Sequence, residues 1–165
     1  MGAAGWLRAG RVGRPHGLDG SFHVLAASPG LLAAGATVVL AERELRIVRR
    51  AGTDSRPIVR LEGYESRNAA AALRDEELMV ARVDAPALGD DEWWAEDLEG
   101  CAVHDGRRRV GIVSRLIALP SCEVLEVQRS DRAGEVLVPL VRDAVLSVDV
   151  QRREIEIDLR YLGEE

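Results

Sequence analysis

Short apolar segments separated by turn residues recur through the first half of the chain, and they limit its possible folds more than any other feature. The segments are rich in β-branched residues or alternate apolar with polar side chains; the clearest are residues 22–26, 37–41, 45–50 and 58–63. Turn-forming residues separate them, as in the SPG sequence at residues 28–30. Apolar segments this short, bounded in this way, are typical of β-strands.

One segment breaks this β pattern and predicts a helix. Residues 66–78 contain four consecutive alanines followed by Leu73 and Arg74, all of them strong helix formers. Ser66 stands where its hydroxyl can cap the first turn. We therefore predict one short helix that plugs or flanks a small barrel, followed by a strand over residues 78–83.

The second half of the chain also predicts β-structure. Asp105-Gly106 forms the turn of a hairpin signal over residues 101–113. Further alternating segments follow at residues 123–127, 135–140 and 154–159. A stretch rich in proline, glycine and acidic residues precedes this half and is typical of a linker. The predicted fold is therefore mainly all-β, with small domains at residues 1–84 and 92–165 and a linker at residues 85–91.

Composition limits the chemistry of the chain. All 22 basic residues are arginine, so a P-loop lysine and a Schiff-base lysine are both absent. The cysteines, Cys101 and Cys122, make no disulfide framework, and we expect them to be reduced and buried. Cys101 and His104 form a single C-x-x-H pair, which is fewer ligands than a structural zinc site needs. We expect no metal, no catalytic residue and no membrane contact, and a cytoplasmic location.

Charge is unevenly distributed along the chain. Residues 1–85 hold 12 arginines against 10 acidic residues, a net charge of +2. Residues 86–165 hold 10 arginines against 18 acidic residues, a net charge of −8. This asymmetry indicates a different partner for each half, although ordinary solvation of the surface is an equal alternative.

The stretch GRPHGLDGSFHV at residues 13–24 is the first candidate site. Its glycines follow neither the dinucleotide-binding nor the P-loop spacing, and a strand rather than a helix comes next. We interpret it as a sharp turn in which Pro15 fixes φ while Gly17 and Gly20 permit positive φ. Exposed basic side chains in or beside the bend are candidates for hydrogen bonds to RNA phosphates: Arg11, Arg14 and His16.

The second candidate site is the pair Trp93-Trp94, within the acidic segment DDEWWAEDLEG. Neighbouring side chains diverge on a strand and on a helix, so one domain core cannot easily bury both indoles. We expect one indole to pack inward and the other to face the domain junction or a partner. Tryptophan is enriched among binding hot spots, and surrounding carboxylates favour a basic partner. The alternative is a plug at the domain interface that binds no external ligand.

Five segments in a fixed order give the chain a resemblance to the RimM family of bacterial ribosome maturation factors: GRPHGLDGSFHV, LEGYESRNAAAALRDEEL, DEWWAEDLEG, LVPLVRDAVLSVD and EIEIDL. The resemblance runs from about Leu7 to Leu162. It implies an N-terminal six-stranded β-barrel like those of translation factors, with one short helix, and a C-terminal PRC-barrel. It also implies a non-catalytic, monomeric assembly chaperone without a cofactor. Such a factor binds the head of the small (30S) ribosomal subunit through its nineteenth protein (uS19) and assists 16S rRNA maturation.

The resemblance also assigns roles by position. The family's adjacent aromatic pair, usually two tyrosines and implicated in subunit binding, falls on Trp93 and Trp94. The basic-polar start of the helix adds Arg67 to the possible RNA or ribosome contacts. The family's PHG turn corresponds to Pro15, His16 and Gly17.

The sequence departs from the family at two places, and two alternative functions are also compatible with it. Tryptophan in place of tyrosine removes the phenol oxygens, so a partner contact through ring burial would be kept and one through a hydroxyl lost. Asp75 stands where the family tends to carry glycine after the helix. A flavin-reductase-like barrel enzyme is one rival, recognisable by flavin absorbance. A PRC-barrel adaptor outside the ribosome is the other, and it leaves the N-terminal barrel unexplained.

Overall fold

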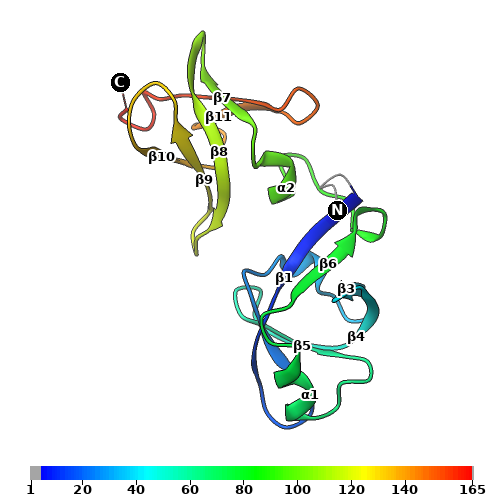
Figure 1. Ribbon diagram of the computed structural model, residues 1–165. Helices are drawn as coiled ribbons and strands as arrows, with labels where there is room; N and C mark the ends of the chain where they lie inside the picture. The colour runs from blue at the N-terminus through cyan, green and yellow to red at the C-terminus, as the bar shows by residue number, and fades with distance from the viewer. Residues whose placement is uncertain (1–4, 165) are drawn as a thin grey trace. The chain divides into compact units, whose positions relative to one another are not determined.

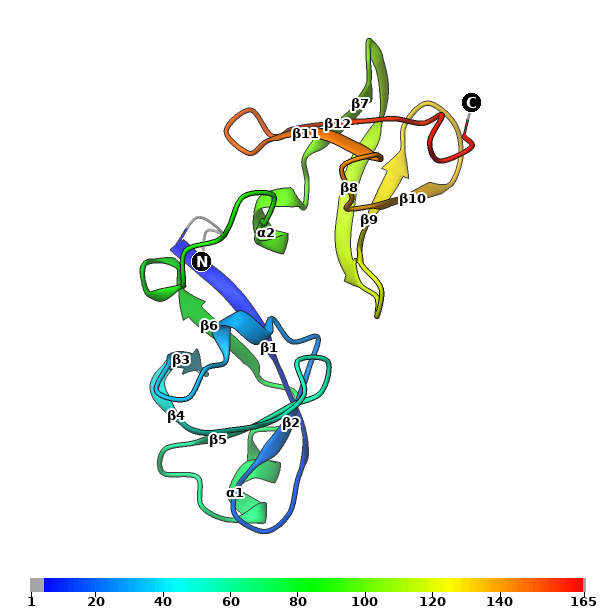
Figure 2. The same ribbon diagram turned by 180° about the vertical axis from the view of Figure 1, so that it is seen from behind.

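The computed structural model describes residues 5–164. The chain divides into two compact units, residues 1–88 (unit 1) and residues 89–165 (unit 2), and each is built mainly from β-strands (Figures 1 and 2). This confirms the predicted fold class. Among the described residues, no helix has the length and apolar character that crossing a bilayer requires.

Unit 1 contains six strands and one α-helix. The elements are β1 (Trp6–Pro15), β2 (Phe22–Leu25), β3 (Thr37–Leu40), β4 (Arg43–Gly52), β5 (Pro57–Leu61), α1 (Arg67–Ala72) and β6 (Glu77–Ala81). The strands form a closed barrel in the order β1-β2-β5-β4-β3-β6, as the family resemblance implied. Seven large side chains that are at most 1% exposed fill its interior: Leu7, Phe22, Leu32, Leu40, Ile47, Leu61 and Leu78.

Helix α1 begins where the sequence predicts and ends earlier. Ser66 is its N-cap, and the Ser66 Oγ accepts a hydrogen bond from the Ala69 backbone N–H at 3.1 Å. The prediction of a helix through residue 78 is wrong, because the chain turns after Leu73 and Asp75 takes a left-handed φ of +71°. The last predicted helical residues therefore belong to β6. Figures 1 and 2 both show α1 beside the loop that joins β1 to β2.

Unit 2 contains the second sheet. Its elements are α2 (Ala95–Leu98), β7 (Ala102–Asp105), β8 (Arg108–Ala118), β9 (Glu123–Arg129), β10 (Glu135–Pro139), β11 (Val145–Asp149) and β12 (Glu154–Ile157). The six strands lie in the order β10-β9-β8-β7-β12-β11, so β10 and β11 are the edges. The predicted hairpin is β7–β8, but its two-residue turn is Gly106-Arg107, because Asp105 pairs with Arg108. Cys101 is buried as expected, whereas Cys122 is only half-buried, and both thiols are free.

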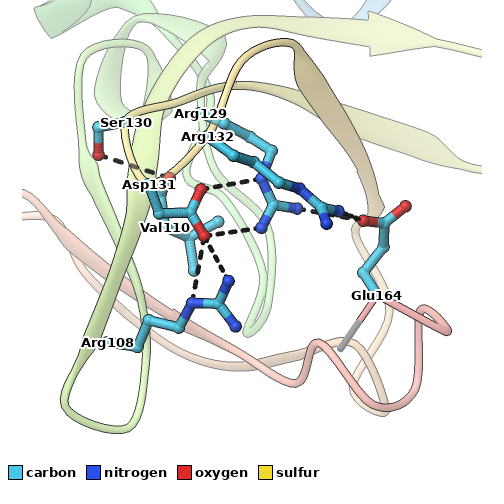
Figure 3. A network of polar contacts seen from close by, with 7 residues as sticks. All are labelled: Arg108, Val110, Arg129, Ser130, Asp131, Arg132 and Glu164. Atoms are coloured by element: carbon cyan, nitrogen blue, oxygen red, sulfur yellow. Dashed lines mark hydrogen bonds and ion pairs between the residues drawn. The ribbon is translucent and has the colours of Figure 1, made fainter.

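A buried arginine ties the end of the chain to the sheet of unit 2 (Figure 3). The side chain of Arg129 is 1% exposed. Its Nε and Nη2 donate to the two carboxylate oxygens of Asp131 at 2.9 and 2.8 Å, and its Nη1 donates to Glu164 at 3.2 Å. Arg108 donates to Asp131 as well, and Arg132 donates to Glu164. Hydrogen bonds from Arg129 and Arg108 hold the pKa of the Asp131 carboxyl well below its usual range. We call these five residues the Arg129 cluster.

Candidate functional site

The first candidate site is the loop between β1 and β2, residues 16–21, which is a tight and internally bonded turn. The His16 N–H donates to the Ser21 carbonyl at 2.8 Å and closes the loop. Gly20 has a φ of +92°, and a Cβ at this residue would lie 1.9 Å from the carbonyl oxygen of Tyr64. The β1–β2 loop therefore packs against the segment that leads into α1.

Asp19 fixes the loop to the outer surface of the barrel. Its carboxylate accepts from the Ser21 N–H at 3.0 Å and from Arg49 Nη1 at 2.8 Å. Hydrogen bonds from Ser21, followed by the effect of the Arg49 guanidinium, lower the pKa of Asp19 to about 2. Arg49 and Arg60 are opposite each other on β4 and β5, and Arg60 Nη1 lies 3.6 Å from the same carboxylate. Asp19 thus separates two like charges while it orders the loop.

The depressed pKa of Asp19 predicts an acid transition of the loop. A carboxyl with a folded-state pKa of about 2 and an ordinary value of 3.8 stabilises the loop above pH 4. This contribution is lost as the pH falls through the folded-state value. We expect the amide proton shift of Ser21 to titrate with a midpoint near pH 2 by NMR, and the titration to vanish in Asp19→Asn. A midpoint near pH 4 would contradict the bonding pattern.

The structure brings together three of the four predicted RNA contacts. Arg67 Nη1 donates to the Gly17 carbonyl at 3.0 Å, so the start of α1 lies against the β1–β2 loop. Burial, and then the neighbouring His16 and Arg14, lower the pKa of His23 on β2, so both basic side chains lie near His23. Arg11 is separate: it is exposed earlier on β1, opposite Leu25 and Glu77. Among the described residues, no hydrogen bond or ion pair joins Arg11 to the other three.

The second candidate site surrounds Trp93 in unit 2. Trp93 and Trp94 lie in the irregular segment before α2, and both side chains are half-buried. Trp93 packs against the core of unit 2, whereas Trp94 occupies the N-cap position of α2. Trp93 also lines a groove of about 340 Å³, the Trp93 groove, together with Asp91, Arg142, Val145, Leu146, Ser147 and Val148.

One wall of the Trp93 groove comes from an edge strand. Four of its lining residues belong to β11, which pairs with β12 on one side and is an edge of the sheet. Leu146 on this strand is 58% exposed. Arg142 Nε donates to Asp91 at 2.9 Å beside the indole. The groove therefore offers apolar surface from Trp93 and Leu146 next to a strand edge. The sequence indicates the indoles but not β11, because the VLSVD sequence of this strand begins with two adjacent apolar residues and does not alternate regularly.

Carboxylates lie close together near this segment. Asp90, Asp91 and Glu92 are exposed immediately before Trp93. Burial raises the pKa of Glu123 at the start of β9, and the Glu92 carboxylate raises it further. Like charges held this close favour a cationic partner, because its binding relieves their repulsion.

Comparison with known proteins places both units in one family. The model of the RimM N-terminal domain matches residues 7–85, and that of the RimM PRC barrel domain matches residues 95–161. The chain is 34% identical to the ribosome maturation factor RimM of Frankia alni over 172 aligned positions, covering 90% of this chain and 91% of the relative. It is 33% identical to that of Sorangium cellulosum over 155 positions, covering 88% and 90% of the two chains.

One solved structure is similar to part of this chain. The solution structure of the N-terminal domain of RimM from Thermus thermophilus covers 51% of this chain and 98% of that domain. Its sequence identity is 22% and its TM-score is 0.43. The two matching domain models and the full-length relatives show that the chain belongs to the RimM family of ribosome maturation factors.

Proposed function

We propose that this protein is a non-catalytic assembly factor that binds the head of the small ribosomal subunit through uS19 and assists 16S rRNA maturation. Full-length relatives that carry the name ribosome maturation factor support this proposal. We further propose that the chain has two modules with different partners, residues 1–84 and residues 92–165, which are joined by a linker at residues 85–91. The single observation that carries the proposal is the Trp93 groove.

The Trp93 groove has the chemistry of a protein-binding site rather than of an RNA-binding site. An indole anchored on the core presents a rigid apolar surface, which is typical of binding hot spots. Arg142 pairs with the one carboxylate of the groove lining, Asp91, while the unit as a whole has a net charge of −8 over residues 86–165. The field of this net charge disfavours phosphates, whereas a protein that itself binds RNA is cationic. A basic ribosomal protein with an apolar side chain for the groove fits both properties.

The exposed basic side chains of unit 1 support a contact with RNA. Arg14, His16 and Arg67 lie in or against a loop that Asp19 and Gly20 hold in place. Basic groups on a rigid loop are suited to phosphates, because little conformational entropy is lost when they bind. We therefore assign RNA to unit 1 and the ribosomal protein to unit 2.

Truncation of the groove tests this assignment. We expect Trp93→Ala to weaken binding to isolated small subunits about 30-fold, the loss typical of a hot-spot tryptophan. Trp94→Ala is expected to have a smaller effect in the same direction, because Trp94 is not among the residues that line the groove. Trp93→Tyr, which restores the family's usual ring, is expected to keep most of the affinity. Binding would be measured by co-sedimentation with small subunits.

Two further variants separate binding from folding. Trp93 packs on the core, so its truncation also lowers the stability of unit 2. Leu146→Asp changes an exposed wall of the groove without opening a cavity and is expected to weaken binding as well. Tyr161→Ala, which removes a 53% exposed aromatic residue outside the groove, is the matched control. Unchanged co-sedimentation of Trp93→Ala and Leu146→Asp would contradict the proposed function.

A further inference from the structure

Four basic side chains gather on the outer surface of the unit 1 barrel, where β2 lies between β1 and β5. They are Arg14 on β1, His16 in the β1–β2 loop, His23 on β2 and Arg56 in the turn before β5. The rings of His16 and His23 meet edge to face, with centroids 5.1 Å apart and an interplanar angle of 89°. Arg14 and Arg56 lie close enough to act on His23 electrostatically. We call this group the His23 cluster.

The charges that face His23 have the same sign from every side. β1 contributes Arg14, the β1–β2 loop contributes His16, and the turn before β5 contributes Arg56. The residue opposite His23 on β5 is Ile58, which is uncharged. Burial, and then these three basic groups, lower the pKa of His23 below the ordinary value of a histidine. Asp19, the carboxylate of the same loop, is engaged by Arg49 instead.

The guanidinium groups of the His23 cluster have no partner among residues 5–164. Within the described residues, neither Arg14 nor Arg56 makes a side-chain hydrogen bond or an ion pair, and both are exposed. The arginines on the neighbouring strands differ: Arg49 and Arg60 lie within ion-pair distance of Asp19, and Arg50 pairs with Asp54. The cluster therefore concentrates positive charge and hydrogen-bond donors that the folded chain leaves uncompensated.

We propose that the His23 cluster binds a phosphodiester of an RNA backbone and that His23 takes up a proton when the phosphate binds. This inference rests on the proposed function, in which unit 1 contacts RNA. A guanidinium presents a planar fork of N–H donors that matches two phosphate oxygens, and an imidazolium adds a further charged donor. The inference adds His23 and Arg56 to the predicted contacts and gives the two histidines a shared role.

Proton uptake makes the site dependent on pH. Burial and the surrounding basic groups lower the pKa of His23 in the free protein and so favour the neutral imidazole. A bound phosphate favours the charged imidazolium and raises that pKa. By linkage, the affinity for RNA then increases as the pH falls through the bound-state pKa and on to the free-state pKa of His23, by at most about tenfold for each unit by which binding raises the pKa.

Proton NMR of the full chain tests the site directly. The sequence contains three histidines, and His104 lies on β7 in unit 2, where it serves as an internal reference. The Hε1 shifts of all three would be followed against pH for the free protein and with a short RNA hairpin, inorganic phosphate or an oligoglutamate peptide. We expect RNA to raise the pKa of His23 by about one unit.

A matched pair of variants links the titration to the cluster. Arg56→Gln removes an exposed cation of the cluster, and Arg46→Gln removes an exposed arginine on β4, opposite Thr37. We expect Arg56→Gln to abolish the rise in the His23 pKa and to lower the salt slope of RNA binding by about one, whereas Arg46→Gln keeps the pKa rise. An unchanged His23 pKa, or the same rise in both variants, would overturn the site. A rise with inorganic phosphate or the peptide but not with RNA would overturn its assignment to RNA. Loss of subunit binding in Trp93→Ala is a separate readout, so either proposal can fail alone.

Discussion

Replacement of Gly20 by alanine is expected to unfold unit 1 under conditions in which unit 2 remains folded. The added Cβ would lie 1.9 Å from the carbonyl oxygen of Tyr64, 2.7 Å from its carbonyl carbon and 3.1 Å from the Glu65 Cα. All three are backbone atoms, so no side-chain rotation can relieve the overlap. The φ of +92° adds backbone strain for any L residue. We expect a loss of about 4 kcal/mol from the free energy of unfolding, most of what a small domain has.

Gly17 in the same loop is the matched control. Its φ of +67° is also left-handed, but nothing lies within 4 Å of an added Cβ. Gly17→Ala is therefore expected to cost only the strain of the left-handed conformation, about 1 kcal/mol. Urea unfolding followed by amide NMR signals resolves the two units in the full chain. Equal destabilisation of unit 1 by both substitutions would show that the β1–β2 loop does not pack as described.

Removal of the buried guanidinium is expected to produce the second large effect, in unit 2. Arg129→Ala leaves a cavity at a side chain that is 1% exposed and releases Asp131 and Glu164 from their hydrogen bonds. We expect the free energy of unfolding of unit 2 to fall by about 3 kcal/mol. The substitution leaves the carboxylates without their counter-charge, and it removes the packing of the buried side chain. Arg129→Met keeps the aliphatic volume and is expected to lower the free energy of unfolding by less.

Arg132 provides the comparison for the Arg129 cluster. It donates to the same Glu164 carboxylate, but its side chain is 48% exposed. A solvent-exposed pair contributes at most about 1 kcal/mol, so Arg132→Ala is expected to change the urea midpoint of unit 2 only slightly. Similar urea midpoints for Arg129→Ala and Arg132→Ala would contradict the view that Arg129 contributes more to the stability of unit 2 because it is buried.

The strands of unit 1 could largely be predicted from sequence, whereas the interruptions in the elements could not. β2, β3 and β5 follow local alternation, and burial of their apolar faces agrees with it, whereas Ile47 is the only buried residue of β4. β1 has less regular alternation, because glycines occur within it; at Gly10 the register with β6 shifts and an added Cβ would lie 2.4 Å from Val24. The early end of α1 is followed by the left-handed φ of Asp75, a conformation that local helix propensity does not predict.

Only part of each candidate site could be predicted from the sequence, because the remaining residues come from distant segments of the chain. Trp93 can be identified from the sequence as one of two adjacent tryptophans in an acidic segment. Most of the other residues that line its groove come from β11, which is distant in the sequence. His23 is an alternating residue within a strand pattern, and nothing local distinguishes it. Its setting is created by Arg56, which the pairing of β2 with β5 brings near. Long-range strand pairing decides both sites, and local patterns do not encode it.

Cryo-electron microscopy of the full chain bound to small ribosomal subunits tests the central claim most directly. The claim is that the indole of Trp93 and the edge of β11 hold a basic ribosomal protein while the chemistry of the RNA is left unchanged. The proposed function predicts protein density from the subunit head in the Trp93 groove, in contact with the indole and Leu146. A bound state in which the groove faces solvent, or in which RNA occupies it, would contradict the claim.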